Sequence, residues 1–174
     1  MTRIKDALDA VAAAIIAQKD YLTDLDRQIA DGDHGINMTR GFQAAMDAVE
    51  EMDDTTKPGP VLETIGKAFI HNVGGAAGPL YGTGFIKAAA VCDEDTKLNV
   101  ASFEKLLGAA IAGIEKRGHA KKGDKTMLDA WLPAAEAAAL AIARGESEAA
   151  FWRQVVAAAR RVAALPVQSA GETA

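Results

Sequence analysis

The sequence predicts an all-α fold, in which about eight antiparallel helices run up and down as a bundle or barrel. Three observations predict it. Apolar residues recur at spacings of three and four through most of the 174 residues, as on one face of a helix. No segment shows the period-two alternation with β-branched residues that is typical of strands. The breaks between helical segments are short, which favours antiparallel neighbours in a single domain spanning residues 1–174.

The first half of the chain contains four helical segments. We expect helices over residues 2–19, 21–30, 36–52 and 61–73. Leu8 and Val11 lie on the apolar face of the first segment. Thr23 is of the residue type that caps a helix, and we place it at the start of the second. The sequence Lys57-Pro58-Gly59-Pro60 breaks the pattern, so the fourth helix is expected to begin after it.

The second half contains four more. We expect helices over residues 80–92, 99–117, 125–143 and 148–164. Pro79 suits the first turn of the fifth helix, where a missing N–H costs nothing. Asp124 is a good N-cap for the seventh. Gly145 and Ser147 separate the last two.

Alternate connections lie at the same end of an antiparallel bundle. The turn at residues 31–35 follows the second helix, the loop 74–79 the fourth and the loop 118–124 the sixth. The plainer connections at residues 57–60 and 93–97 fall at the other end. The acidic and glycine-rich loops therefore converge, and we expect the binding site at their end.

Composition excludes several classes of protein. A formal net charge of -5 argues against binding nucleic acid through a basic surface. One cysteine, Cys92, excludes an internal disulfide framework, and we expect it to be a buried small hydrophobe. No uncharged run is long enough to span a bilayer, and the first residues do not form a secretory signal. We therefore expect a cytoplasmic protein that does not bind membranes.

Three carboxylates, those of Asp26, Asp31 and Asp33, surround a glycine-containing turn. At that density they repel one another unless a hard cation lies between them, and Mg²⁺ is the usual one. They offer ligands for either one or two such ions. Asp24 should point elsewhere, because residues two apart on a helix do not share a face. Helix capping with solvation is the alternative, but three Asp, two Gly and a His together favour the metal site.

A helix beginning just after this turn directs its first N–H groups at the same place, which suits a phosphate. The residues assigned to cofactor binding here are His34, Gly35, Ile36, Asn37 and Thr39. We expect His34 to contact phosphate rather than to carry a phosphoryl group. Thr39 also fits the apolar stripe of its helix. Carboxylates, metal, phosphate and a helix start together indicate a nucleotide site.

Two further loops add to this interpretation. The sequence Gly74-Gly75-Ala76-Ala77-Gly78 supplies N–H groups without side-chain bulk, but it lacks the Lys-Ser/Thr ending of a P-loop. Turns between helices also use glycine, so alone it is weak evidence. Met127 follows the Gly118–Gly123 loop, where it could face an adenine ring or belong to the core.

Four motifs, taken in order, resemble the nucleotide-binding L subunits of dihydroxyacetone kinases. They are Leu22-Thr23-Asp24-Leu25-Asp26, Asp31-Gly32-Asp33-His34-Gly35-x-Asn37-Met38, Gly74-Gly75-Ala76-Ala77-Gly78-Pro79-Leu80-Tyr81-Gly82 and Gly123-Asp124-Lys125-Thr126-Met127-x-Asp129-x-Trp131-x-Pro133. They cover most of residues 20–135. The resemblance implies a barrel of antiparallel helices with a nucleotide at one end.

The resemblance also implies ligands. ADP or ATP would be bound with Mg²⁺, and the metal ligands would be Asp26, Asp31 and Asp33. Phosphate contacts would fall to His34, Asn37 and the turn formed by Ala76 and Ala77. The adenosine would lie near Gly118 and Met127. Many family members have serine where Ala77 stands, so one hydroxyl contact would be missing here while the backbone N–H remains.

The activity implied is phosphoryl transfer. In the bacterial members bound ADP is recharged to ATP by a phosphohistidine protein of the sugar phosphotransferase system, and the γ-phosphoryl passes to dihydroxyacetone on a separate K subunit. Two alternatives stay open: an ATP-dependent kinase subunit for another small ketose, and a non-catalytic helical protein that docks a partner. Some family members contact transcription regulators, and a homodimer also remains open.

Family members usually continue with a segment that encloses the nucleotide, whereas this sequence stops at Ala174. We expect a domain shortened at its C-terminus, with reduced cover on the ribose side and reduced nucleotide affinity.

Overall fold

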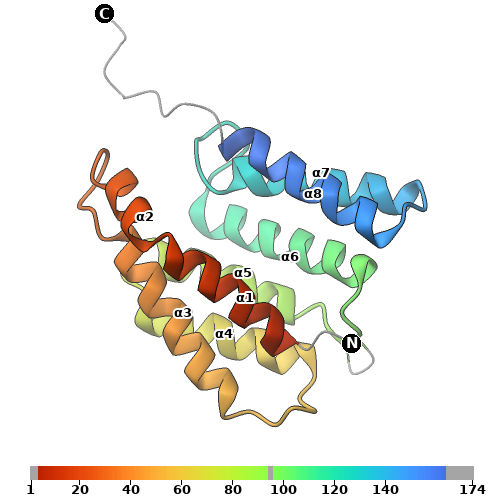
Figure 1. Cartoon of the computed structure of the whole chain (residues 1–174), viewed down its shortest axis with the longest axis horizontal. Coiled ribbons are helices and arrows are strands. Elements are labelled where there is room, and N and C mark those ends of the chain that lie inside the picture. Colours follow the sequence, from red (N-terminus) through yellow and green to blue (C-terminus); the bar gives the residue numbers. More distant parts are fainter. Residues whose placement is uncertain (1–3, 94–95, 164–174) are drawn as a thin grey trace, which may run out of the picture.

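The computed structural model describes residues 4–93 and 96–163, and within these ranges the chain forms eight α-helices and no strand. In order they are α1 (Ile4–Ala17), α2 (Lys19–Asp26), α3 (His34–Glu50), α4 (Pro58–Asn72), α5 (Ala77–Ala89), α6 (Val100–Gly118), α7 (Leu128–Ala143) and α8 (Glu148–Ala163) (Figure 1). The all-α prediction is confirmed. None of these helices is both long enough and apolar enough to cross a lipid bilayer. The expected shortening at the C-terminus falls outside the described residues.

Successive helices pack against one another as antiparallel neighbours from α2 to α8 (Figure 1). The pair α1 and α2 is different, because α2 continues from α1 after a break at Gln18 and the two make little contact. The helix α1 packs on α3 instead. This does not disturb the expected alternation of ends, which depends only on the order from α2 onward.

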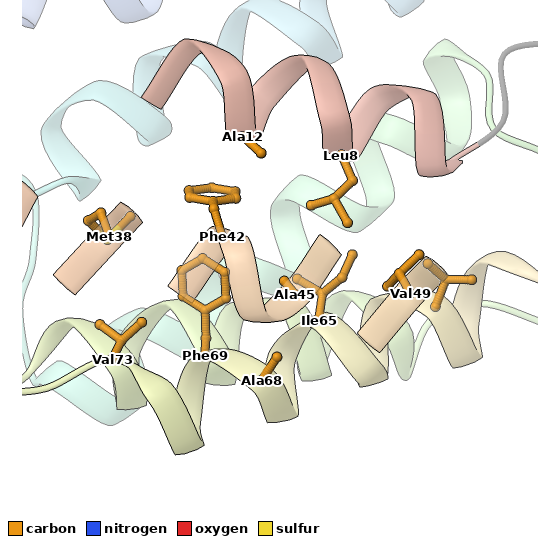
Figure 2. Packing of buried hydrophobic residues seen from close by; sticks show 11 residues of the cluster. Leu8, Ala12, Met38, Phe42, Ala45, Val49, Ile65, Ala68, Phe69 and Val73 are labelled. Carbon is orange, nitrogen blue, oxygen red and sulfur yellow. The ribbon is translucent and has the colours of Figure 1, made fainter. Parts of the chain in front are cut away.

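The larger core lies between α1, α3 and α4 (Figure 2). Its buried members are Leu8, Ala12, Met38, Phe42, Ala45, Val49, Val61, Ile65, Ala68, Phe69 and Val73. Phe42 of α3 and Phe69 of α4 meet edge to face, with ring centroids 5.0 Å apart, which is a favourable aromatic geometry. This core fixes the orientation of α3, the helix that begins at the acidic turn.

A second core joins α6, α7 and α8. Its buried residues are Ala134, Ala138, Ala141, Phe151 and Val155, with Phe103 and Leu107 of α6 packed against them. Alanines make up most of the α7 contribution, so α7 and α8 can approach closely. The aromatic rings of Phe103, Phe151 and Trp152 contact one another along this interface.

Three expectations about helix starts are wrong. Thr23 does not cap α2, since the helix begins at Lys19 and Thr23 is buried inside it. The helix α4 begins at Pro58 rather than after Pro60, because a proline is tolerated at the first helical position. Asp124 does not cap α7, which begins at Leu128; its carboxylate accepts a hydrogen bond from the N–H of Lys121 within the preceding loop instead.

Candidate functional site

Three loops lie at the same end of the helices, as the alternation predicts. These are the α2–α3 turn, the α4–α5 loop and the α6–α7 loop, all on the left of the view in Figure 1. The helices α3, α5 and α7 all begin at this end. The first N–H groups of a helix have no partner within it and carry partial positive charge, so this end is suited to an anion.

The three predicted metal ligands do come together. Asp26, Asp31 and Asp33 each place a carboxylate oxygen so that the three oxygens lie within 4.8 Å of one another. Opposite ligands of one octahedral Mg²⁺ lie about 4.2 Å apart, so small side-chain movements fit this set to one ion. Asp26 is half-buried and the other two are exposed, which leaves room for phosphate oxygens or water. The donor set is all oxygen, as Mg²⁺ prefers.

Asp26 has a second task that the sequence did not reveal. Its Oδ2 accepts hydrogen bonds from the backbone N–H groups of Asp33 at 3.0 Å and His34 at 3.3 Å. Asp33 is the N-cap of α3 but makes no capping bond with its own side chain. The carboxylate of Asp26 therefore caps α3 from the end of the preceding helix, which holds the three carboxylates in one place.

Two glycines allow this turn to close. Gly32 has a φ of +75°, a conformation that side chains other than glycine rarely adopt. Gly35 lies directly against α2, since a Cβ built there would be 2.0 Å from the carbonyl oxygen of Lys19 and 2.5 Å from Oγ1 of Thr23. Gly35 thus acts through the close approach of α3 to α2.

Asp24 points away from the cluster, as expected. Its carboxylate is 2.7 Å from a guanidinium nitrogen of Arg27, and both side chains are exposed. An exposed pair of this kind contributes little to stability. Of the two acidic residues at the end of α2, only Asp26 can therefore cap α3 and bind a metal.

Asn37 lies in the first turn of α3 and is buried, with 6% of its surface exposed. Its Oδ1 accepts a hydrogen bond of 2.6 Å from Arg40, whose Nε also donates to the carbonyl of Asn72 at 2.6 Å. A Cβ built on Gly74 would lie 3.4 Å from the amide of Asn37. The predicted phosphate residues on α3 and the glycine-rich loop after α4 are thus brought into contact.

The other predicted residues of α3 differ in exposure. His34 is half-buried at the first position of the helix, and Ile36 is 47% exposed beside it. Thr39 is one turn further along, and its Oγ1 is buried without a hydrogen-bond partner among the described residues. Its hydroxyl therefore faces the packed side of α3, as its place in the apolar stripe allows.

Ala76 and Ala77 stand at the start of α5, where Ala76 is the N-cap. The first helical bond runs from the N–H of Leu80 to the carbonyl of Ala76, so the earlier N–H groups have no partner within the helix. Gly75 has a φ of +62°, and a Cβ built on it would meet nothing within 4 Å. Gly75 therefore borders open space at the start of α5.

Gly118 and Met127 flank the third loop. Gly118 is the last residue of α6, and a Cβ built on it would be 3.0 Å from Cδ2 of Leu80 on α5. Met127 is half-buried and packs against a core cluster that includes Ile114 and Leu128. Met127 therefore packs partly in the core, and its contact with an adenine ring stays a prediction.

Asp129 organises this third loop and was not predicted as a site residue. Its carboxylate accepts hydrogen bonds from the N–H groups of Gly123 at 2.6 Å, Lys125 at 2.8 Å and Thr126 at 3.3 Å. The bond from Gly123 is the main cause that lowers the pKa of Asp129 below the ordinary value of 3.8. Lys125 takes a positive φ of 58° in this loop. The position of Asp129 within the turn motif was the only available signal.

Comparison with known proteins identifies a family for this chain. The model of the DAK2 domain family matches residues 28–165, which is most of the chain. A Listeria innocua protein named PEP-dependent dihydroxyacetone kinase 1, ADP-binding subunit DhaL, is 43% identical over 121 residues, covering 68% of this chain and 59% of that protein. The Escherichia coli PEP-dependent dihydroxyacetone kinase, ADP-binding subunit DhaL, is 37% identical over 135 residues, covering 78% and 64%.

A more distant similarity is to a Mycolicibacterium smegmatis D-erythrulose kinase, 32% identical over 148 residues that cover 84% of this chain and 26% of that protein. The chain thus matches 59% and 64% of the lengths of the two ADP-binding subunits. The family match includes the α2–α3 turn from residue 28 onward, the glycine-rich loop and the Asp129 loop. The chain belongs to the DAK2 domain family.

Proposed function

We propose that this protein is a nucleotide-binding subunit of a dihydroxyacetone kinase that holds ADP or ATP with Mg²⁺. The observation that carries the proposal is the meeting of three carboxylate oxygens within 4.8 Å at an end of the bundle where three helices begin. Acidic side chains alone would repel a nucleotide, and helix N-termini alone would not need carboxylates. Together they suit a metal-bound polyphosphate.

The residues of the site have separate binding roles. Asp26, Asp31 and Asp33 hold the cation, which when bound neutralises charge on the phosphates. Asn37, His34 and the backbone at Ala76 and Ala77 donate hydrogen bonds to phosphate oxygens. The adenine would lie beside Gly118 and Met127. No residue of the chain is assigned as a base or nucleophile, since phosphoryl transfer depends on positioning and charge stabilisation.

The partners follow from the names of the relatives, which are ADP-binding subunits of PEP-dependent kinases. We propose that a phosphohistidine protein of the phosphotransferase system rephosphorylates the bound ADP, and that a separate subunit presents dihydroxyacetone. The test is reconstitution with purified partner subunit, phosphotransferase proteins and phosphoenolpyruvate. Dihydroxyacetone phosphate should form only when this chain is present, and its absence with all components active would contradict the proposal.

A second candidate is favoured by the similarity to the D-erythrulose kinase, which extends over 84% of this chain. The chain would then serve a ketose kinase that uses free ATP. Turnover with ATP and no phosphotransferase proteins, compared for dihydroxyacetone and erythrulose, separates the two. Turnover that needs phosphoenolpyruvate and the phosphotransferase proteins favours the first candidate.

A further inference from the structure

Arg40 lies where two segments of the phosphate side of the site meet. Its Nε donates to the carbonyl of Asn72, the last residue of α4, at 2.6 Å. Its Nη2 donates to Oδ1 of Asn37, in the first turn of α3, also at 2.6 Å. One side chain therefore links the helix start beside the acidic cluster to the backbone that leads into the loop at Gly74.

The contact with Arg40 determines which way the Asn37 amide faces. An asparagine side chain offers one acceptor oxygen and one NH₂ group, whereas a guanidinium can only donate. The oxygen of Asn37 must therefore face Arg40, and its NH₂ is left as the group that can bind a ligand. Because Asn37 is 6% exposed and packs against Gly74, this orientation is held by its surroundings.

Arg40 is itself held in place. The carbonyl of Asn72 is one of the last four of α4. These carbonyls accept no hydrogen bond within the helix and carry partial negative charge. A cation donating to it is stabilised there. The side chain of Asn72 is engaged as well, through a 2.9 Å bond from its Nδ2 to the carbonyl of Ala68. The guanidinium is thus fixed by the end of one helix while it orients a residue at the start of another.

We propose that Arg40 is a positioning residue for nucleotide phosphate: it turns the NH₂ of Asn37 toward the phosphate. This inference rests on the proposed function, because it needs a phosphate ligand at this end of the bundle. Arg40 acts through Asn37 rather than by touching phosphate. The distinction is testable, since a residue acting through another adds nothing once that other residue is removed.

The experiment measures ADP and adenosine binding in the presence of Mg²⁺ for Arg40→Ala, Asn37→Ala and the double variant. Arg40→Ala should weaken ADP binding roughly tenfold, the effect of one charge-assisted hydrogen bond, and leave adenosine unchanged. The double variant should bind ADP no more weakly than Asn37→Ala alone. Arg40→Lys should recover part of the affinity, because an ammonium can still donate to Oδ1. Arg144 is an exposed arginine at the opposite end of the bundle. Arg144→Ala should therefore bind ADP as tightly as the wild type.

Four binding results would overturn the inference. Additive losses in the double variant would mean that Arg40 contacts the ligand directly. Equal losses for ADP and adenosine, with a lower melting temperature, would mean that it only maintains the fold. Unchanged ADP binding in Arg40→Ala would remove the role while leaving the proposed function intact. A wild-type chain that binds no ADP would overturn the proposed function and this role with it.

A readout without nucleotide separates orientation from binding. The side-chain NH₂ signal of Asn37 should shift in the nucleotide-free protein on Arg40→Ala and hardly shift on Arg144→Ala. An unmoved signal would show that Arg40 does not orient the amide, whatever happens to ADP affinity.

Discussion

The carboxylate of Asp26 accepts a hydrogen bond from the backbone N–H of Asp33, with 3.0 Å between the nitrogen and Oδ2. The same oxygen accepts from the N–H of His34 at 3.3 Å. A metal ligand at the end of α2 therefore also caps α3, and the acidic cluster depends on the helix start that it stabilises.

The two tasks of Asp26 should separate by substitution. Asp26→Asn keeps an oxygen that can cap α3 but loses the charge, so metal-dependent ADP binding should fall while the melting temperature changes little. Asp26→Ala loses both, and the free energy of unfolding should drop by about 1–2 kcal/mol. Denaturant unfolding and calorimetric titration of each variant give the comparison. Equal destabilisation by both substitutions would show that the charge, not the cap, maintains the turn.

The approach of α3 to α2 should not tolerate a methyl group at Gly35. Its Cβ would stand 2.0 Å from the Lys19 carbonyl oxygen, so Gly35→Ala must push the helices apart and should destabilise by about 1–3 kcal/mol. Gly108, inside α6, is the matched control, since a Cβ there meets nothing within 4 Å. Gly108→Ala should stabilise by roughly 0.5–1 kcal/mol. The account of Gly35 fails if urea unfolding finds the two alanine variants equally stable.

The three backbone bonds to Asp129 should order the α6–α7 loop. Asp129→Ala should expose the chain near Lys121, Lys122 and Lys125 to trypsin and raise the cleavage rate at this loop. Asp124→Ala is the control, because Asp124 accepts one backbone bond here rather than three. The measurement is limited proteolysis with mass spectrometry of the fragments. If Asp124→Ala is cleaved as fast as Asp129→Ala, the loop does not depend on Asp129.

The loop should also respond to acid. The pKa of Asp129 is lower in the folded than in the unfolded protein. The ionised carboxylate therefore stabilises the fold at any pH above the unfolded pKa, and this stabilisation is lost as the pH falls through the folded pKa. Amide signals of Gly123 and Lys125 should therefore hold their positions from neutrality down to the ordinary value of 3.8, and move only below it. Movement that begins well above 3.8 would contradict the lowered pKa.

The thiol of Cys92 should react slowly with alkylating reagents. Cys92 is half-buried rather than buried as expected from the sequence. This partial burial raises its pKa above 9.0, and the neighbouring Asp93 carboxylate raises it further. The folded protein favours the neutral thiol. The resulting contribution to stability is present at any pH below the unfolded pKa and is lost as the pH rises through the folded pKa. Alkylation by iodoacetamide at neutral pH should be slower than that of free cysteine, and should accelerate in alkaline solution. A rate equal to that of free cysteine at neutral pH would contradict this.

Helical periodicity and the order of the loops were readable in the sequence. The convergence of the acidic turn with the glycine-rich loop followed from alternation alone, because it needs only the order of antiparallel helices. Asp26, Asp31 and Asp33 could be grouped because they are close in sequence and chemically alike. Their carboxylate oxygens do lie within 4.8 Å of one another, and their binding of a metal ion stays a prediction.

The helix starts, and the residues that hold the site in place, are harder to predict from the sequence because they depend on contacts between helices. Thr23 has the chemistry of a cap but is buried in α2, where Gly35 of α3 packs against it. Asp124 has the same chemistry, yet it is Asp129 that accepts hydrogen bonds from three N–H groups of that loop. Arg40 stands three residues after Asn37, a spacing that suggests a shared face, but its second partner on α4 could not be known.

The most direct test of the account is calorimetric titration of ADP into the purified chain with Mg²⁺ and with a chelator. The account predicts saturable binding that needs Mg²⁺ and that weakens roughly 10- to 100-fold or more in Asp31→Asn. Asp24→Asn, on α2 but outside the cluster, should bind like the wild type. ADP binding that is indifferent to both the chelator and Asp31→Asn, or no ADP binding at all, would contradict the account.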